Sequence, residues 1–389
     1  MPKIREQEIL GRKLRANPLY DLVLFDRLEP ELRQRLANLE KDADFYGVLA
    51  PSPPSPGASV KAVDRDTALL FLTLREPGPL PAYVRRIEGE AARVVAQLVA
   101  DGVLEIAAES GGFVSGAAAF PLLWEEGTEG RSGRLAELSL AALRYGQALA
   151  TSDPLELSLR LYGFNRRPLN PFWKRLLPDA AAVEHHLGIG PGGVNRRLLE
   201  TSWKRTAPSA SWLSWRRRER ERAPEPSPGG AIWKLYVSPQ PEALAAGFGR
   251  IVEALAAARA AQFKMGANAA GLLRPDKIVA YFGSFEQLAA AAEAMGERLA
   301  GTPAQGVPFT SEIGGDGLLS WGVDPPADSW SGSESWRLWL THRLAIALLA
   351  GKNAGTAGVE PWRFALERLR LEGVDTDSWT PGGRLFRKD

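Results

Sequence analysis

Two short apolar segments in the last third of the chain carry cations where buried strands do not normally have them. Residues 262–265 and 277–282 have the length and apolar content of buried strands, yet they contain Lys264 and Lys277, and Arg274 comes just before the second segment. An unpaired ammonium inside a protein is costly unless an anion offsets its charge or its pKa falls. We therefore predict that these three cations face one cleft and hold a phosphate or a carboxylate.

Composition restricts the class of protein more than its chemistry. The chain has 389 residues, enough for two or three domains, and its 45% hydrophobic and 24% charged residues are typical of soluble globular proteins. Because 48 basic residues stand against 46 acidic ones, attraction to nucleic acid would require a local patch. The absence of cysteine excludes disulfides, thiolate nucleophiles and Cys-ligated metals, and fits a reducing cytoplasm.

The sequence gives no sign of a targeting or membrane segment. Residues 1–15 are charged and lack an apolar core, and no run of roughly 18 apolar residues occurs. We expect a cytoplasmic protein with no membrane partner.

An α+β protein of three consecutive parts is predicted. A winged-helix-like domain covers residues 1–123, a helical middle segment with a Pro-rich linker covers 124–230, and an α/β sandwich with a mostly antiparallel sheet covers 231–389. The run Pro-Glu-Pro-Ser-Pro-Gly-Gly at 224–230 marks the clearest boundary.

The N-terminal part has local helix and turn signals that are typical of a small separable unit. Leu and Phe recur at helical spacing over residues 17–44. Helices are then expected over 68–74, 81–87 and 90–100, followed by a hairpin of 103–106 with 112–115. We predict that residues 61–115 form a unit of helices and a two-stranded wing.

The middle segment combines helical patterns with a basic, Trp-containing stretch. A helix is expected over 134–150, and residues 196–222 hold nine Lys or Arg and three Glu around Trp203, Trp212 and Trp215. That mixture suits a nucleic-acid or acidic-peptide surface, but a solvated helix end explains it more simply. The neighbours His185 and His186 are expected at a helix end, pointing too far apart to chelate one metal.

The third segment alternates strands and helices. Strands are expected over 232–237, 262–265, 277–282, 307–313 and 318–321, and helices over 242–261, 285–299, 333–349 and 361–371. Its glycine-rich connections match neither a phosphate-binding loop nor a dinucleotide fingerprint. The loop residues Asp316 and Asp324 are weak candidates for a divalent ion, and we predict neither a metal nor a cofactor.

The order of elements in 61–115 resembles a winged helix. It is also similar to the small peptide-recognition domains of ribosomal-peptide modification enzymes, which hold a leader peptide with that topology. A wing that binds nothing is the alternative, because topology alone does not determine function.

Residues 230–349 resemble the phosphothreonine-lyase fold group, which includes type III secretion effector lyases and the lyase domains of lanthipeptide synthetases. The likeness is carried by short motifs: Phe263-Lys264, Arg274-Pro275-Asp276-Lys277-Ile278-Val279-Ala280-Tyr281, Val307-Pro308-Phe309-Thr310, and Ser335 with His342-Arg343-Leu344-Ala345. The effector lyases have a His two residues after their strand Lys. Here that position is Gly266, so another residue must supply the acid, or elimination does not occur.

Such a reaction needs a base at Cα, a proton donor and cations around the leaving phosphate. We assign the base to Lys264, and the proton donor to His342, the one histidine of the third segment. Phosphate binding is assigned to the remaining cations: Arg274, Lys277, Arg337 and Arg343.

Each assignment has a structural alternative. Lys264 can extend its amine to solvent, and Arg274 can pair with Asp276 in a plain turn. His342 can be a hydrogen-bonded core residue, and Arg343 can stack on Trp339.

The leading hypothesis from sequence is a cytoplasmic protein that eliminates phosphate from Ser or Thr side chains of a peptide, in ribosomal-peptide tailoring. No kinase signature is present, so a separate kinase would phosphorylate the substrate. The alternative is a non-enzymatic adaptor that binds an anionic peptide, or less favourably nucleic acid, through the winged helix and the basic stretch.

Overall fold

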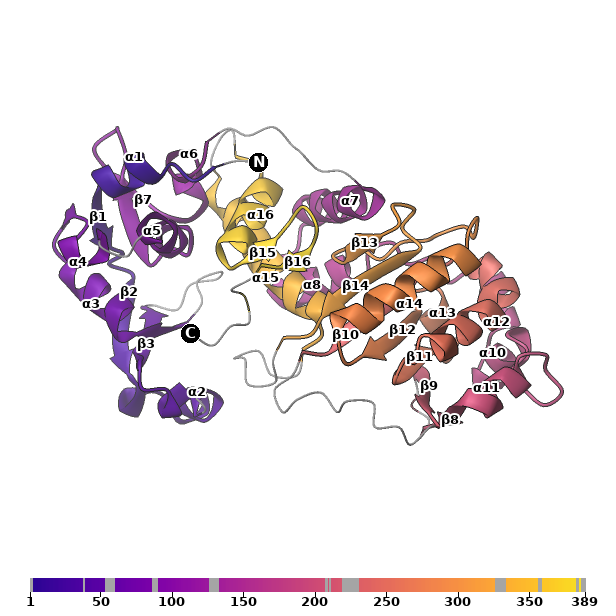
Figure 1. The fold of residues 1–389 in the computed structure, drawn as a ribbon. Coiled ribbons are helices and arrows are strands. Elements are labelled where there is room, and N and C mark those ends of the chain that lie inside the picture. Colours follow the sequence, from indigo (N-terminus) through magenta and orange to yellow (C-terminus); the bar gives the residue numbers. More distant parts are fainter. Residues whose placement is uncertain are drawn as a thin grey trace. The chain divides into compact units, whose positions relative to one another are not determined.

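The structure is a computed structural model of the chain (Figure 1). It describes residues 3–37, 39–52, 60–85, 90–125, 133–206, 209, 211–218, 231–325, 334–355, 359–382 and 385. Helices and antiparallel sheets occur together, which confirms the α+β class. No helix within the described residues has the length and apolar character required to cross a bilayer.

The chain divides into two compact units, which are described separately below. Unit 1 comprises residues 1–130, 146–157 and 342–376, and unit 2 comprises 131–145, 158–341 and 377–389. These units are not the three consecutive segments that we predicted from the sequence. Phe364 and Leu371, from the end of the expected third segment, are buried in the core of unit 1, which explains why residues 342–376 belong there.

Unit 1 contains two small sheets. The first has the strand order β5-β1-β6-β7 and the second the order β2-β3-β4. Their strands are β1 (Lys13–Ala16), β2 (Tyr20–Leu24), β3 (Phe45–Pro51), β4 (Lys61–Asp64), β5 (Gly78–Pro79), β6 (Leu104–Ala107) and β7 (Phe113–Val114). The predicted hairpin is present as β6 and β7, and it joins the sheet of β1 and β5 rather than any strand of unit 2.

Seven helices are described wholly within unit 1: α1 (Glu6–Gly11), α2 (Pro30–Leu36), α3 (Arg65–Thr73), α4 (Ala82–Arg85), α5 (Ala91–Ala100), α6 (Phe120–Leu123) and α16 (Pro361–Leu371). Asp64 caps α3 by accepting a hydrogen bond from the Thr67 amide. The helical spacing expected over residues 17–44 is only partly correct. Residues 20–24 pair with β3 as a strand, and α2 accounts for the rest of the apolar pattern.

Unit 2 is built on a seven-stranded antiparallel sheet with the order β13-β14-β10-β12-β11-β9-β8. The strands are β8 (Trp203–Arg205), β9 (Trp212–Arg217), β10 (Trp233–Val237), β11 (Gln262–Gly266), β12 (Ile278–Phe282), β13 (Ser311–Ile313) and β14 (Leu319–Val323). The mostly antiparallel sheet that we predicted is therefore present.

Two of those strands correct the interpretation of the basic stretch. We expected a solvated helix end, but only α11 (Arg196–Ser202) is helical, and β8 and β9 extend the sheet. Trp203, Leu213 and Trp215 are buried on the core side, and the exposed Lys204 and Arg216 each follow a buried Trp and face the other side of the sheet. Alternation with a period of two is typical of a strand with one buried face. The many charged residues made this alternation hard to recognise in the sequence.

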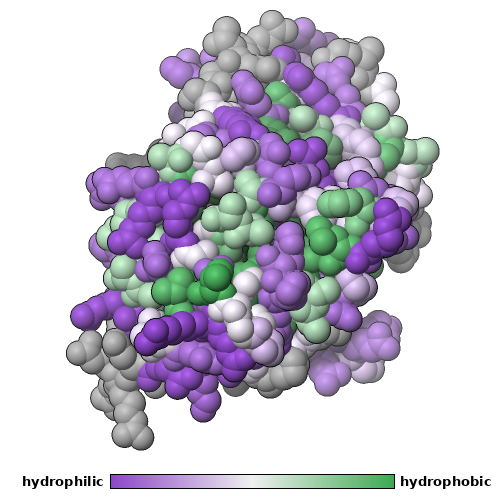
Figure 2. All heavy atoms as spheres, turned by 90° about the vertical axis from the view of Figure 1, so that its right-hand side faces the viewer, coloured by the Kyte–Doolittle hydropathy of each residue, from purple (hydrophilic) through white to green (hydrophobic). Residues whose placement is uncertain are grey.

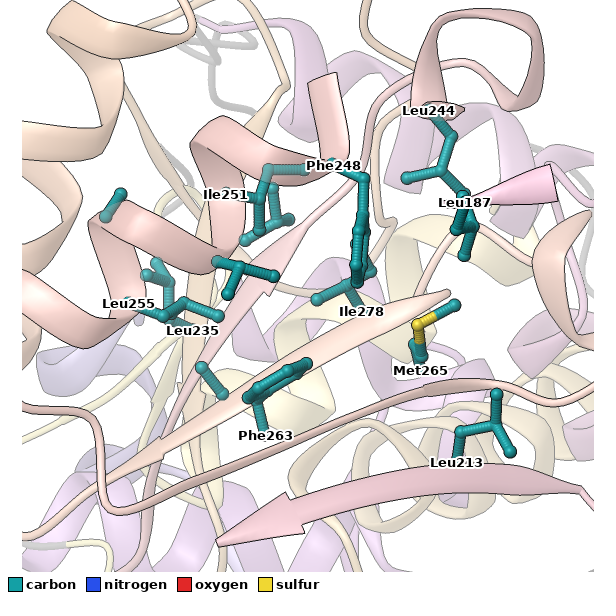
Figure 3. Close-up of a cluster of buried hydrophobic side chains, with 14 of the residues drawn as sticks. Leu187, Leu213, Leu235, Leu244, Phe248, Ile251, Leu255, Phe263, Met265 and Ile278 are labelled. Carbon is teal, nitrogen blue, oxygen red and sulfur yellow. The ribbon is translucent and has the colours of Figure 1, made fainter. Parts of the chain in front are cut away.

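One face of the sheet is covered by α12 (Pro241–Ala257) and α14 (Phe285–Arg298) (Figure 1). Figure 3 shows Phe248, Ile251 and Leu255 of α12 directed at strand residues that include Phe263 and Met265. These side chains are at most 1% exposed. Burial of this face leaves the opposite face for polar side chains.

Shorter helices complete unit 2: α9 (Pro171–Leu176), α10 (Ala180–His186) and α13 (Ala269–Leu272). Three further helices contain residues of both units: α7 (Arg134–Ala148), α8 (Pro154–Tyr162) and α15 (Trp336–Ala354). The view in Figure 2 has hydrophilic residues over much of the surface, with hydrophobic residues in small groups between them.

The strand expected over residues 307–313 is shorter in the structure. Only β13, from Ser311, pairs with β14. Phe309 has a φ of +62°, and the Thr310 hydroxyl donates a hydrogen bond to the Val307 carbonyl at 2.6 Å. This turn interrupts extended backbone, so residues 307–310 form a connection beside the sheet.

Candidate functional site

The second face of the sheet carries cationic and aromatic side chains. Strand alternation places Leu235, Phe263 and Trp215 in the core, and their neighbours along each strand on the other face, called here the open face. On it, Lys264 lies opposite Val279 of β12 and opposite Ser214 of β9.

Trp212 brings two cations of the open face together. The Lys264 amine lies 4.3 Å from the centre of the indole ring, and the Arg274 guanidinium carbon lies 5.0 Å from it. Both distances are within the range of cation–π attraction. Lys264 and Arg274, predicted from the sequence to share a site, are therefore held by the same ring.

Asp276 is the anionic centre of a buried network beside these cations. Two nitrogens of Arg274 donate to its two carboxylate oxygens, each at 2.8 Å, and Arg337 lies at 3.0 Å. The Tyr162 hydroxyl donates to the same carboxylate at 3.0 Å. Burial alone would raise the pKa of Asp276, but Arg337 and Arg274 hold it well below its usual range.

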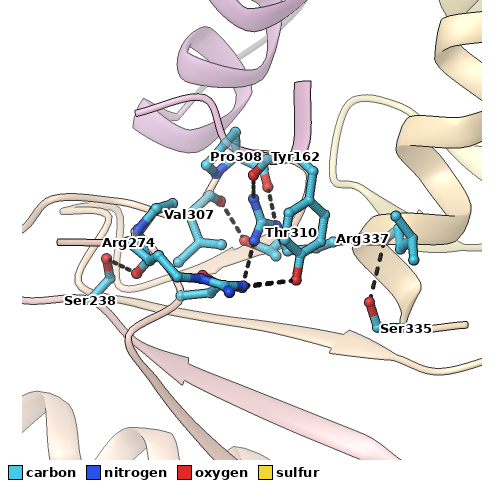
Figure 4. A network of polar contacts seen from close by, with 11 residues as sticks. Tyr162, Ser238, Arg274, Val307, Pro308, Thr310, Ser335 and Arg337 are labelled. Atoms are coloured by element: carbon cyan, nitrogen blue, oxygen red, sulfur yellow. Dashed lines mark hydrogen bonds and ion pairs between the residues drawn. The ribbon is translucent and has the colours of Figure 1, made fainter. Parts of the chain in front are cut away.

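Arg337 is committed to this network and to backbone carbonyls. It is 1% exposed, and it donates to the Pro308 carbonyl at 3.1 Å and to the Tyr162 carbonyl at 2.8 Å. Its guanidinium carbon also lies 4.4 Å from the centre of the Tyr162 ring (Figure 4). These contacts give Arg337 a structural role. Arg274, by contrast, lies beside Trp212 on the open face.

Lys277 is a fully buried amine with a strongly lowered pKa. Its side chain is 0% exposed, and the amine donates to the Pro239 carbonyl at 2.8 Å and to the Gln305 side-chain oxygen at 2.6 Å. Desolvation lowers the pKa of Lys277 from 10.5 to about 7, and the partly offsetting charge of Asp276 does not restore it. Such an amine is neutral in a large fraction of molecules at neutral pH.

The acceptor of Lys277 is itself held in place. The Gln305 amide donates to the Asn165 carbonyl at 2.6 Å and to the Leu273 carbonyl at 3.2 Å. Asn165 in turn donates to the backbone carbonyls of Gln305 and Gly306, from a left-handed conformation with φ of +66°. The buried amine therefore has a fixed orientation.

A second lysine contributes to the charge of the open face. Lys234 pairs with Asp324 and lies 5.5 Å from the centre of the Tyr281 ring. Burial, followed by the charge of Lys234, lowers the pKa of Lys264. Among the described residues no carboxylate pairs with Lys264, so this part of the face has an excess of positive charge.

Position 266 cannot hold a side chain. A Cβ placed on Gly266 would lie 2.4 Å from the carbonyl carbon of Gly271, a backbone atom that cannot move out of the way cheaply. The departure from the effector-lyase pattern noted in the sequence thus has a steric cause. A His at this position would not fit the present backbone.

The remaining predicted residues are not in this group. His342 and Arg343 belong to unit 1, where Arg343 pairs with Glu372 at 2.7 Å. Asp324 pairs with Lys234, and Asp316 accepts the Leu318 amide in a turn. Within the described part of the chain, no three His, Asp or Glu residues gather as a metal site would require.

Sequence reasoning missed four contributors: Tyr162, Trp212, Lys234 and Gln305. Lys234 stands in an apolar strand just as Lys264 does, so the same signal could have found it. Gln305 gives no such signal, because its neighbours in sequence are ordinary loop residues.

No protein-family model matches the sequence, and no curated protein matches it. Several solved structures are similar. The structure of the effector protein from Pseudomonas syringae pv. syringae strain 61 has 14% identity and a TM-score of 0.37, over 64% of this chain and 100% of that one. The corresponding structure from Pseudomonas syringae pv. tomato strain DC3000 has 12% identity and a TM-score of 0.37.

Phosphothreonine lyases are among the similar structures. One phosphothreonine lyase structure has 10% identity to this chain and a TM-score of 0.25, over 57% of this chain and 99% of that one. The group that the sequence resembles is therefore among the similar structures, at a TM-score of 0.25. Similarity at this level does not show activity, and the winged-helix and lanthipeptide resemblances stay proposals.

Proposed function

We propose that unit 2 binds a phosphorylated Ser or Thr side chain of a peptide and eliminates the phosphate. One observation carries the proposal. Lys277, a buried lysine with a pKa of about 7, lies immediately before β12, and the neighbouring strand β11 carries Lys264, whose amine shares the Trp212 ring with Arg274 and has no carboxylate partner among the described residues. Elimination needs that combination: a neutral amine to take a proton, and fixed cations to receive a leaving dianion.

In the proposed reaction the base takes the Cα proton, a double bond forms between Cα and Cβ, and the Cβ–O bond breaks to release phosphate. The sequence suggested Lys264 as the base, but the lower pKa favours Lys277. Its two hydrogen bonds use two N–H groups of a neutral amine, and its lone pair is left for the proton. Substrate would have to displace the Gln305 side chain from the amine, because the other acceptor is the backbone carbonyl of Pro239.

Lys264 and Arg274 are assigned to the phosphate. Arg274 offers a guanidinium that can share its donors between Asp276 and an oxyanion. Lys264, in its charged form, can both neutralise the leaving group and donate a proton to it. This would replace the acid that cannot be present at position 266.

A direct assay tests the proposal. Purified protein is incubated with peptides that contain phosphoserine or phosphothreonine, and free phosphate and peptide mass are measured together. The expected product is a dehydrated residue, lighter than the substrate by phosphoric acid. Release of phosphate with an intact hydroxyl would indicate hydrolysis and contradict the proposal.

A second candidate function is binding without elimination, as an adaptor for an anionic peptide. The glycine at position 266 favours it, because the acid of the effector lyases has no counterpart there. Tight binding of phosphopeptides without any dehydration would support this candidate. In both cases unit 1 is proposed to recruit the peptide through its winged-helix-like part, and a separate kinase to phosphorylate it. Ribosomal-peptide tailoring of the lanthipeptide kind, in the cytoplasm, is the proposed setting.

Removing the ring of Trp212 should weaken phosphopeptide binding. Cation–π contacts contribute roughly 0.5–2 kcal/mol each, and Trp212 serves both Lys264 and Arg274. We expect Trp212→Leu to raise the Kd about tenfold and Trp212→Phe to raise it less, as measured by calorimetric titration.

Trp215 provides the control for that substitution. It lies on the same strand but faces the core, where it stacks on Phe263. Trp215→Leu should lower the melting temperature more than Trp212→Leu and affect the Kd less. Equal Kd values for wild type and Trp212→Leu would remove Trp212 from the site.

The predicted roles of His342 and Arg343 stay predictions. The variant His342→Asn tests the predicted role of His342 as proton donor. Lost elimination at an unchanged melting temperature would assign His342 the proton, whereas a lower melting temperature alone would indicate a packing role.

A further inference from the structure

A second group of cations lies on the open face, on the two strands at the end of the sheet. Lys204 of β8 is directly opposite Arg216 of β9, and both side chains are exposed. Like charges directly opposite each other on neighbouring strands destabilise the pair. Among the described residues no carboxylate pairs with either of them. No described carboxylate therefore offsets the repulsion between Lys204 and Arg216.

The pair is the outer end of a row that leads toward the candidate site. Strand register continues it from Arg216 to Gln262 of β11, then to Tyr281 of β12 and Lys234 of β10. Lys264 is two residues from Gln262 on the same strand and therefore on the same face. The row thus joins an exposed cationic edge to the cations that we assign to the phosphate.

We propose that Lys204 and Arg216 bind acidic side chains that flank the phosphorylated residue of the peptide substrate. This inference rests on the proposed function and specifies its substrate class. Neighbouring strands are about 4.8 Å apart, so β8 lies about 10 Å from β11. An extended peptide advances about 3.3 Å per residue. The acidic residues are therefore expected about two to three positions from the phosphorylated one.

Charged residues on an edge strand also have a protective role, since they discourage pairing with another chain. That role predicts self-association when the charges are removed, with no change in peptide preference. The two explanations therefore differ in what they expect of a peptide series.

The test uses two phosphoserine peptides that differ only in having Glu or Gln at the second and third positions on each side. Wild-type protein should bind the Glu peptide about tenfold more tightly, a preference that salt should reduce. In the double variant Lys204→Gln/Arg216→Gln the preference should fall to about twofold or less, at a melting temperature no lower than that of wild type, because the repulsion between the two charges is removed.

Arg205 supplies the matched control. It is the next residue on β8, faces the other side of the sheet and pairs with Glu184 at 2.7 Å. Arg205→Gln removes the same charge from the same strand and should keep the preference for the Glu peptide. A preference retained by the double variant, or lost equally in the control, overturns the inference.

Two further results separate this inference from others. If single-stranded oligonucleotides compete at the row while the two peptides bind equally, the surface is a nucleic-acid site and the inference is wrong. If the protein eliminates no phosphate but the double variant still loses the preference, the proposed elimination fails and the acidic-peptide row stands.

Discussion

Replacing Lys277 by methionine should reduce phosphate elimination by about a hundredfold to ten-thousandfold, the usual contribution of a general base. Methionine fills a similar apolar volume but cannot take a proton. Among the described residues, the hydrogen-bond acceptors of Lys277 are Pro239 and Gln305, so phosphopeptide affinity should change little. Single-turnover rates and Kd values of the same variant measure the two effects separately.

The pH dependence of the rate should follow the same amine. With a pKa of about 7 for Lys277, the wild-type rate should rise as pH increases through neutrality. Lys264→Met is the comparison variant, since it should weaken phosphopeptide binding as well as slow the reaction. Full activity in Lys277→Met would show that Lys277 is not the base and return that role to Lys264.

Stability gives a second measurement that is independent of activity. The folded-state pKa of Lys277 is about 7, against 10.5 for the ordinary group. Between these values the unfolded chain binds more protons, so the free energy of unfolding of wild type should rise with pH across this window. Subtracting the same curve for Lys277→Met isolates this contribution. A pH-independent difference would mean that the amine is not desolvated in solution.

The sequence predicts local structure in unit 2 better than it predicts the site. Apolar alternation and helix caps are local signals, and they located the central strands and the two helices that cover them. The basic strands β8 and β9 were not predicted, because their charges resemble those of a solvated helix. They belong to the sheet because β9 pairs with β11, which is remote in sequence, and β8 pairs with β9.

The site itself is made by distant residues. The pairing of Arg274 with Asp276, two residues away, was the structural alternative to a phosphate-binding role, and it is present in the structure. Tyr162 is separated from Asp276 by 114 residues, and no local pattern connects them. For Lys277, the sequence indicated that burial requires either a nearby anion or a lowered pKa. In the structure the amine donates to two neutral acceptors, and desolvation lowers its pKa more than the charge of Asp276 raises it.

Substituting Asp276 by asparagine should be the most destabilising conservative change in unit 2. The carboxylate is 3% exposed and balances Arg274 and Arg337, so its loss leaves two guanidiniums without their counter-ion. Removing one partner of a buried ion pair costs about 3–5 kcal/mol. Denaturant unfolding of Asp276→Asn at neutral pH should show a loss of this size.

Acid should remove the difference between wild type and Asp276→Asn. The folded-state pKa of Asp276 lies below its ordinary value of 3.8, so its contribution to stability is complete above that value. It is lost as pH falls through the lower, folded-state pKa, and the two unfolding free energies should converge there. Asp316→Asn, in an exposed turn that accepts one backbone amide, is the matched control and should leave stability nearly unchanged. If Asp276→Asn were no less stable than Asp316→Asn at neutral pH, the guanidiniums would not depend on Asp276. The ordered position of Arg274 over Trp212 would then need another explanation.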